Sequence, residues 1–391
     1  MKRIFMDNAS TTRVDKEVIK AMLPIFSEYY GNPSSIHKEG RKALEYLDKS
    51  RKQVADLIHA KNDEIIFTAG GTESDNIPIK GVAYQNKEKR GSKGPHIITS
   101  TIEHPAVLES VKHLENQGFK VKYLPVDEFG IIKIDELQNS ISKNTFLISI
   151  MFANNEIGTI EPVEEIGKVA KENNISFHTD AVQAIGKIPI NVKKLNIDML
   201  ALSSHKIYGP KGVGACYIRK GVKLEPIIHG GGHEGGLRSS THNMPGAVGL
   251  GKACELLKNR MGKDIPYLKK LRDNLIKNIL EIEESYLNGH PTKRLVNNAN
   301  FRFHGVEGES LLLSLDEKGI AASTGSACSS KKSRASHVLT AIGLDSVESQ
   351  GTIRLSLGRD NTEDEVEYVS KIFPEIIEKL RKISPIWKNK R

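Results

Sequence analysis

Apolar and polar residues follow two different periods along the first 260 residues of the chain. Apolar residues three to four positions apart predict helices over 16–30 and 40–59, and another helix from Thr72. Candidate strands, short segments with apolar residues, lie at 64–68, 96–100, 120–124, 145–151, 175–179, 197–202 and 213–218. This alternation predicts an α/β fold in which helices cover both faces of a mostly parallel, seven-stranded sheet.

The rest of the chain has a different order of elements. A long helix is predicted over 245–285. Strands are then predicted at 299–303 and 351–357, and helices at 308–318 and 362–383. Because 391 residues are too many for a single core, we expect two domains. A large domain is expected over 15–260, and a smaller α+β domain is expected to combine 1–14 with 261–391.

Composition and charge narrow the class of protein. No apolar run approaches the roughly 18 residues of a membrane helix, and the start of the chain lacks the long apolar segment of a signal peptide. We therefore expect a cytoplasmic protein without membrane contact. The net charge of +9 is spread along helix faces, with no compact basic block that includes aromatic residues, so no direct DNA binding is expected.

Three cysteines are too few, and too irregularly spaced, for a disulfide framework or a zinc site. Cys216 and Cys254 lie in strand-like and helix-like runs and are expected to be inert core residues. Cys328 differs, because its neighbours over 323–330 are small and polar. It is either a thiol on a mobile loop that can reach a site, or an incidental exposed thiol.

Lys206 and Asp180 carry the strongest chemical signal. Each follows an apolar strand-like run, and ligands of parallel sheets bind beyond the carboxyl ends of the strands. A lysine in such a place must be paired or neutral, since a buried ammonium is costly. One chemistry that requires it is a Schiff base with an aldehyde cofactor whose pyridinium nitrogen faces a carboxylate. The alternative for Asp180 is a helix N-cap.

Further residues complete a hypothetical cofactor site. The glycine turn that ends at Gly71, with Thr72 at a helix start, could bind a phosphate through backbone N–H groups, although such turns are common. Ser203 and His205 would supply further donors. Gln183 could reach the phenolic oxygen of the ring.

Two more sets of residues have open alternatives. His104 could stack on the ring, or it could be a capping histidine. Arg354 lies inside an apolar strand pattern, so it could bind a substrate carboxylate with both arms or form an internal salt bridge. Asn155 could help to hold that carboxylate.

Eight segments in order resemble a cysteine desulfurase of the NifS/IscS type, nearly from end to end. They are Asp7–Thr12, Gly31–Ser35, Thr72–Asn76, Glu103–His104, Asn154–Gly158, His178–Gln183, Ser204–Gly212 and Gly325–Ser330. The resemblance implies the aminotransferase-like fold of type I and pyridoxal 5′-phosphate (PLP) as cofactor. It also implies removal of sulfur from L-cysteine, which leaves L-alanine.

The resemblance assigns a role to each candidate residue. Lys206 would form the Schiff base and move protons, and Cys328 would take the sulfur as a persulfide. The ring would be held by Asp180, Gln183 and His104, the phosphate by Thr72, Ser203 and His205, and the substrate carboxylate by Asn155 and Arg354. No metal is expected, apart from a transient iron–sulfur cluster on Cys328.

The resemblance also implies a homodimer, in which Thr241 contacts the phosphate of the other subunit. Gly235 and Ser240 depart from the family pattern in this loop, where arginine and glycine are usual. An iron–sulfur scaffold, or an acceptor for tRNA thiolation or a thio-cofactor, would receive the sulfur. The alternatives are a selenocysteine lyase and a sulfur-relay or scaffold-binding protein with little catalysis. Trp387 is either a partner contact or a residue packed back on the surface.

Overall fold

The computed structural model describes residues 3–87, 94–324 and 336–388. Its largest sheet has seven strands within these residues, in the order β2-β8-β7-β6-β5-β3-β4. The strands are β2 (Ile65–Thr68), β3 (His96–Ser100), β4 (Lys120–Leu124), β5 (Thr145–Ser149), β6 (Ser176–Asp180), β7 (Met199–Ser203) and β8 (Gly214–Ile218). Of these, β8 runs antiparallel to both of its neighbours, and the other pairs are parallel. The predicted mostly parallel sheet is confirmed.

Helices cover both faces of this sheet, because alternate strand residues point to opposite sides. The helices are α1 (Lys16–Ser27), α2 (Lys38–Ile58), α3 (Gly71–Asn86), α4 (Pro105–Glu115), α5 (Ile134–Ser140) and α6 (Val163–Glu172). In β2, Ile66 packs in a cluster with residues of α3 and α4, whereas Phe67 packs in another cluster with residues of α1, α2 and α6.

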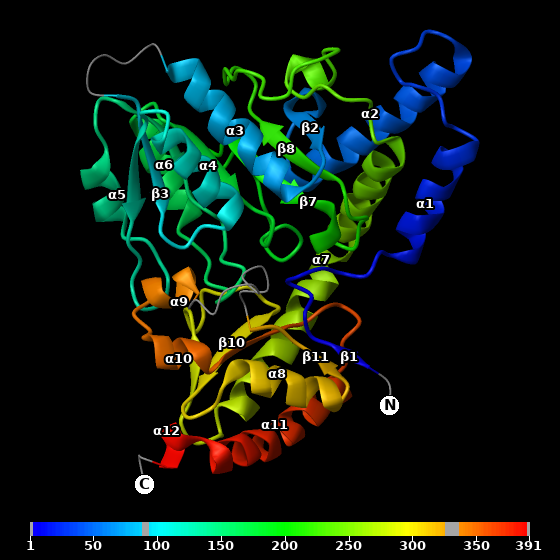
Figure 1. Ribbon diagram of the computed structural model, residues 1–391. Coiled ribbons are helices and arrows are strands. Elements are labelled where there is room, and N and C mark those ends of the chain that lie inside the picture. The colour runs from blue at the N-terminus through cyan, green and yellow to red at the C-terminus, as the bar shows by residue number, and fades with distance from the viewer. Residues whose placement is uncertain (1–2, 88–93, 325–335, 389–391) are drawn as a thin grey trace.

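The long helix α7 (Met244–Ile279) connects two hydrophobic cores (Figure 1). Its residues up to Leu257 pack in the core of the large sheet, and its residues from Leu268 pack in a second core. The predicted helix end at 285 is wrong. The Ser285 hydroxyl donates to the carbonyls of Ile279 and Ile282, which caps the helix, and the next strand begins at Ser285.

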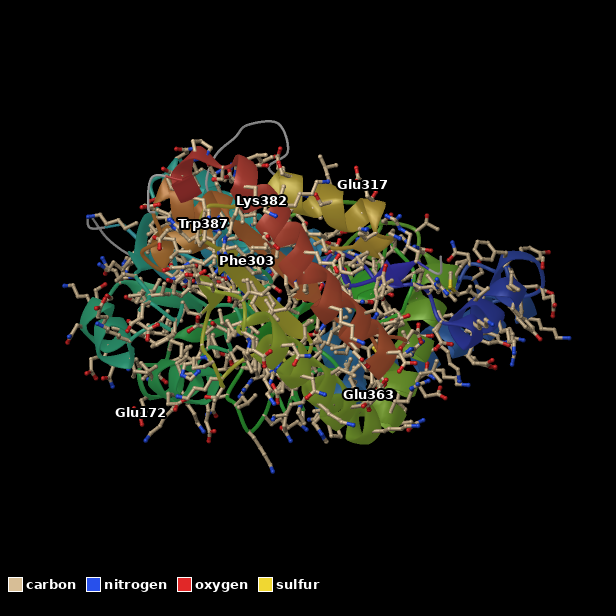
Figure 2. The ribbon with its side chains drawn as sticks, turned by 90° about the horizontal axis from the view of Figure 1, so that it is seen from below. Glu172, Phe303, Glu317, Glu363, Lys382 and Trp387 are labelled. Atoms are coloured by element: carbon tan, nitrogen blue, oxygen red, sulfur yellow. The ribbon has the colours of Figure 1, made fainter. Side chains whose placement is uncertain are left out.

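The second core lies around a three-stranded antiparallel sheet, in the order β12-β10-β9. The elements that follow α7 along the chain are β9 (Ser285–Asn288), β10 (Asn298–Phe303), α8 (Gly308–Glu317), β11 (Ile320–Ala321), α9 (His337–Ala341), α10 (Ser346–Gln350), β12 (Thr352–Ser356), α11 (Glu363–Ile383) and α12 (Pro385–Lys388). The N-terminal strand β1 (Ile4–Phe5) pairs with β11. In Figure 2, α11 runs along the outside of this part from Glu363 to Lys382. The proposed domain boundaries themselves stay a prediction.

None of the helices in the described residues is long and apolar enough to cross a membrane. The cellular compartment stays a prediction.

Candidate active site

Loops that follow the parallel strands place the candidate cofactor residues at one edge of the large sheet. The strands β2, β3, β5, β6 and β7 run in the same direction, so their carboxyl ends share that edge. Gly71 follows β2, His104 follows β3, Asp180 ends β6 and Lys206 follows β7. The fold therefore brings together residues that are up to 135 positions apart (206 minus 71).

Lys206 ends a short 3-10 turn that directly follows β7. Its Nζ donates to the carbonyl oxygen of Ala9 at 2.6 Å and to that of Ser10 at 2.7 Å. These two carbonyls accept hydrogen bonds from the half-buried ammonium. This agrees with the expectation that a lysine directly after a buried strand needs polar partners. The amine is thus held in a defined position against the N-terminal segment Asp7–Thr12.

Asp180 is only 7% exposed. Its Oδ1 accepts a hydrogen bond from the N–H of Val182 at 2.9 Å, although the next residues form turns rather than the helix that an N-cap would start. Burial raises the pKa of this carboxyl and outweighs the lowering effects of His104, the Val182 N–H and Lys206. Asp180 is therefore a buried acid that a nearby cation would ionise.

His104 caps α4, as the alternative interpretation held. Its Nδ1 accepts from the N–H of Ala106 at 3.1 Å, and this role requires a neutral ring with its proton on Nε2. Burial lowers the pKa of His104, and Lys206 and His337 lower it further, against the opposing effect of Asp180. Capping uses one ring nitrogen and does not conflict with a second role for the ring face.

Two further acids near Asp180, Asp75 and Glu103, are also buried. Asp75 Oδ1 is 3.5 Å from Nε2 of His178, which lies two residues before Asp180 on β6. Burial lowers the pKa of His178 to about 3. Burial raises the pKa of Asp75 well above its usual value and that of Glu103 to about 8. At neutral pH Glu103 therefore mostly holds its proton, and the nearby Lys206 favours the charged form of Asp180.

A cavity of about 660 Å³ lies at the N-terminal end of α3. The predicted phosphate-binding residues Gly71, Thr72, Ser203 and His205 all line it. The first turn of α3 has no side-chain cap, so its backbone N–H groups remain for an anion. A Cβ at Gly71 would lie 3.2 Å from Val182 Cγ2 and 3.4 Å from Ser203 Cβ, so a larger residue would crowd the cavity wall.

The donor chemistry of this cavity fits a phosphate. The lining includes backbone N–H groups, the hydroxyls of Thr72 and Ser203, and the His205 imidazole. Burial lowers the pKa of His205 to about 4, with further lowering by Lys206 and Lys211, so the ring binds as a neutral donor. These residues fit the phosphate of PLP, and the one carboxylate among the described lining residues, Glu73, is paired with Arg238. Lys206 and Asp180, the residues predicted for the aldehyde and the ring nitrogen, do not line this cavity.

Arg354 lies on β12 and its side chain is 3% exposed. Its Nη1 donates to the carbonyl of Asn155 at 2.9 Å, and its Nη2 donates to Asp7 Oδ1 at 2.9 Å and to Ser10 Oγ at 2.8 Å. The alternative of an internal salt bridge is therefore observed. Asn155 and Arg354 are in contact, as a shared carboxylate site requires.

The segment Asp7–Thr12 lies at the centre of the site, although the sequence analysis gave it no role. The Ala9 carbonyl accepts from both Lys206 and Gln183 Nε2, the latter at 3.0 Å. Ser10 contacts Lys206 through its carbonyl and Arg354 through its hydroxyl. One segment thus bridges the candidate cofactor and substrate residues, and its match to the family pattern was the signal that could have revealed it.

Other residues that line the cavity were also missed. They are Ser10, Thr11, Asn76 and Lys211. Lys211 follows Lys206 by five residues in the same glycine-rich stretch, and Asn76 is one turn into α3. Their closeness in sequence to Lys206 and Thr72, which were predicted, is the signal that could have indicated Lys211 and Asn76.

Thr241 is exposed and does not line the main cavity. It lines a neighbouring cavity of about 230 Å³ together with Ser240, which is consistent with a contact made outside its own chain but does not test it. Gly235 has φ +65°, a left-handed conformation that glycine adopts without strain. The glycine at position 235, where the family usually has arginine, thus suits the left-handed backbone conformation of this loop.

The three cysteines fall into two groups. Cys216 and Cys254 are free thiols in the core, and burial raises the pKa of both, so the prediction of inert core residues is confirmed. Cys328 lies outside the described residues, and its role stays a prediction. Within the described residues there is no group of three or more His, Cys, Asp or Glu that could hold a metal ion.

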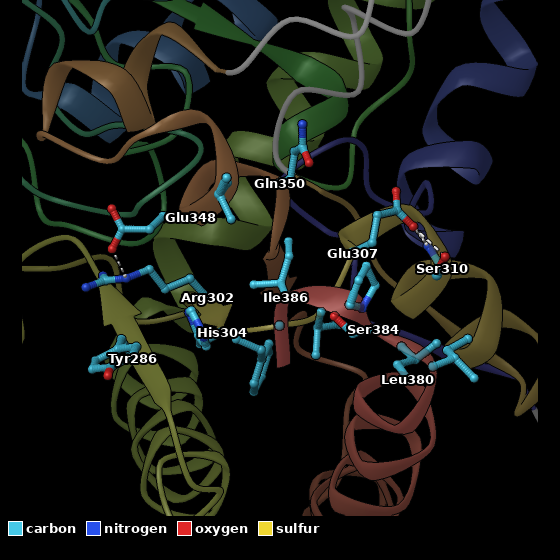
Figure 3. Close-up of a pocket in the computed structure, with 16 residues that line it drawn as sticks. Tyr286, Arg302, His304, Glu307, Ser310, Glu348, Gln350, Leu380, Ser384 and Ile386 are labelled. Atoms are coloured by element: carbon cyan, nitrogen blue, oxygen red, sulfur yellow. Dashed lines mark hydrogen bonds and ion pairs between the residues drawn. The ribbon is translucent and has the colours of Figure 1, made fainter. Parts of the chain in front are cut away.

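Another cavity, of about 280 Å³, lies near the C-terminal helix α12 and contains none of the candidate residues (Figure 3). Nearby, Trp387 stacks with Arg381, whose guanidinium carbon is 4.0 Å from the ring centroid, and lies 6.1 Å from the His304 ring. Trp387 is therefore packed back on the surface of the C-terminal part.

Comparison with known proteins identifies the family. Residues 4–369 match the family model "Aminotransferase class-V". The chain belongs to the class-V aminotransferase family. The cysteine desulfurase IscS of Methanosarcina thermophila is 56% identical over 385 residues, which are 98% of this chain and 94% of that protein.

Solved structures agree with this assignment. A NifS-like protein matches with a TM-score of 0.89 and 42% identity over 97% of this chain and 100% of that chain. SspA in complex with cysteine matches with a TM-score of 0.82 and 40% identity over 92% of this chain and 100% of that chain. These neighbours have the type I fold, and the family is PLP-dependent, so PLP is the cofactor of this chain.

Proposed function

We propose that the protein is a cysteine desulfurase that removes sulfur from L-cysteine and releases L-alanine. The observation that carries this proposal is that Lys206 and Arg354 both contact Ser10. An amine suited to an aldehyde cofactor and a guanidinium suited to a carboxylate thus lie on either side of one residue. An α-amino acid carries both an amine and a carboxylate on one carbon, so it presents one group to each of them. The full-length relatives named cysteine desulfurase support cysteine as that amino acid.

Each candidate residue has a defined task in this proposal. When bound, PLP supplies a ring that withdraws electrons from the substrate carbon. Asp180 would bind the ring nitrogen and favour its protonated form, and Gln183 would bind the phenolic oxygen. Lys206 would hold the cofactor, and its amine, once free, would move a proton at the substrate Cα. His104 would lie against the ring face as a neutral imidazole.

Substrate binding falls to Arg354 and Asn155. The Arg354 guanidinium donates hydrogen bonds to the carboxylate of L-cysteine. Asn155 lies beside this guanidinium, because its backbone carbonyl accepts a hydrogen bond from Arg354 Nη1. The buried setting of Arg354 strengthens this interaction because water screens it little.

Cys328 is proposed as the sulfur acceptor. Its thiolate attacks the substrate sulfur, the C–S bond breaks, and a persulfide S–S bond forms on Cys328 while the carbon skeleton leaves as alanine. The thiol protons of the two cysteines supply the hydrogen that alanine and the persulfide need, so no external oxidant or reductant enters this step. Lys331, Lys332 and Arg334 are close in sequence and favour the thiolate.

We also propose a cytoplasmic homodimer that passes the persulfide sulfur to a protein acceptor. Thr241 would then contact the phosphate bound by the other subunit, which agrees with its exposed position outside the main cavity. The acceptor would serve iron–sulfur cluster assembly, or thiolation of tRNA or another cofactor. Direct contact with DNA or a membrane is not part of this proposal.

One experiment tests the function. The purified PLP-loaded protein is incubated with L-cysteine and dithiothreitol, and alanine and sulfide are measured in parallel. Equal amounts of the two products are expected, and the Cys328→Ser variant should keep its PLP absorbance but lose sulfide production. Alanine formation only with an added keto acid would indicate an aminotransferase instead. Sulfide release at the wild-type rate by Cys328→Ser would remove the role of the thiol.

A further inference from the structure

The N-terminal segment places a carboxylate on the guanidinium to which we assign the substrate carboxylate. Asp7 Oδ1 accepts from Arg354 Nη2 at 2.9 Å and from Ser10 Oγ at 2.7 Å. The Ser10 hydroxyl also accepts from Arg354 Nη2 at 2.8 Å. These three side chains form a closed triangle, and the interaction is an ion pair between a buried arginine and an aspartate of the same chain.

The hydrogen bonds of Arg354 leave no complete edge for a second carboxylate. Two-pronged binding of a carboxylate needs two neighbouring N–H groups of the guanidinium. Nη1 is bonded to the Asn155 carbonyl and Nη2 to Asp7 and Ser10. Nε is buried and has no hydrogen-bond partner. A substrate carboxylate that uses Nε together with Nη2 therefore competes with Asp7 and the Ser10 hydroxyl, which are already bonded to Nη2.

We propose that Asp7 is an internal carboxylate that occupies the substrate-carboxylate position of Arg354 and competes with amino-acid substrates for it. The inference rests on the substrate role of Arg354 in the proposed function. Its consequence is that Asp7 lowers the affinity of the site for any ligand that carries an α-carboxylate.

The difference in exposure between the two side chains explains why Asp7 can leave Arg354, and why Arg354 needs a partner when no substrate is bound. The Asp7 side chain is 19% exposed, whereas that of Arg354 is 3% exposed. Asp7 can turn toward water when it is displaced, and the Ser10 hydroxyl remains as a hydrogen-bond donor to it. Arg354 cannot reach water, and a buried unpaired charge is costly. Asp7 thus keeps Arg354 paired whenever no substrate is bound.

The test compares ligands with and without a carboxylate on the PLP-loaded protein. L-Alanine and L-alaninamide are titrated into the wild type and Asp7→Asn, and the change in cofactor absorbance gives each Kd. Asparagine keeps an oxygen that can accept from Arg354 and Ser10 but removes the charge. Asp7→Asn is expected to bind L-alanine about tenfold more tightly, as for one lost charged hydrogen bond, with little change for L-alaninamide.

A matched control is Asp15→Asn. Asp15 also pairs with a largely covered arginine, Arg359, whose side chain is 10% exposed, but Asp15 contacts none of the candidate site residues. This variant is expected to bind both ligands like the wild type. Should Asp7→Asn fail to fold, Ser10→Ala provides the second variant, because it removes the hydroxyl that holds Asp7 on Arg354. It is expected to shift the Kd for L-alanine in the same direction.

The result that would overturn the proposal is an unchanged or higher Kd for L-alanine in both folded variants. An equal gain for L-alaninamide would also overturn it, because the effect would then not depend on the carboxylate. Alanine and sulfide production from L-cysteine is measured on the same wild-type preparation. If the wild type lacks that activity, the proposed function fails, while the comparison of the two ligands still decides the role of Asp7.

Discussion

Glu234 is a buried carboxylate whose loss should destabilise the protein in a way that depends on pH. Its side chain is 1% exposed. Arg51 donates to both of its oxygens, at 2.7 and 2.8 Å, and the Phe67 N–H and the His242 ring are also bonded to it, each at 2.8 Å. These contacts fix the loop that carries Thr241 to α2 and β2.

The magnitude follows from the pKa of Glu234. Burial opposes its ionisation, but the bonds to Arg51 and His242 prevail and lower its pKa from 4.5 to about 2. At about 1.36 kcal/mol per pH unit, the difference between 4.5 and about 2 gives about 3 kcal/mol of unfolding free energy. Because the folded pKa is the lower one, this contribution is complete above pH 4.5 and is lost as the pH falls toward 2.

The assay is urea unfolding of the wild type and Glu234→Gln, followed by circular dichroism at equal protein concentration. The variant is expected to lose about 3 kcal/mol at pH 7 and only about 2 kcal/mol at about pH 3.5. Glu17→Gln is the control, because Glu17 pairs with Lys20 on the surface, where such pairs contribute about 0–1 kcal/mol. A variant as stable as the wild type at pH 7, or a loss that is equal at both pH values, would refute the reasoning.

Three further predictions follow from the site. Arg354→Ala should raise KM for L-cysteine at least about tenfold while PLP absorbance persists; an unchanged KM would make the arginine purely structural. Burial raises the pKa of Glu103 from 4.5 to about 8, so wild-type stability should fall relative to Glu103→Gln between pH 5 and 8 in urea unfolding, and a pH-independent difference would contradict this. The Ser336 hydroxyl donates to buried Glu156 at 2.6 Å, so Ser336→Ala should cost about 1–3 kcal/mol in thermal unfolding; equal stability would show that the bond contributes nothing.

The large sheet could be predicted from sequence because most of its strands are buried and read as short apolar runs, whereas the half-exposed β4 alternates polar and apolar residues. All seven predicted strands form, and β3 and β4 have the predicted bounds. The short strands β1 and β11 were missed, because two residues give no periodic signal and their pairing depends on a contact over more than 300 positions. The end of α7 was also misplaced, since the hydrogen bonds of one side chain, the Ser285 hydroxyl, to the Ile279 and Ile282 carbonyls leave no periodic signal in the sequence.

The candidate site shows the same division between local and distant signals. Lys206 and Asp180 could be found because a charged residue that follows a buried strand is unusual. The contacts of Asp7 and Ser10 with Arg354 could not, because they join residues 347 and 344 positions apart through tertiary packing. The sequence left both outcomes open for Arg354, and the structure shows the internal salt bridge.

The most direct test of the central claim locates the lysine that holds the cofactor. The PLP-loaded protein is treated with borohydride and digested, and the labelled peptide is identified by mass spectrometry. The pyridoxyl label is expected on Lys206 and should be absent from Lys206→Ala treated in the same way. A label on Lys187, Lys211 or any other lysine of the wild type, with Lys206 unmodified, would contradict the account.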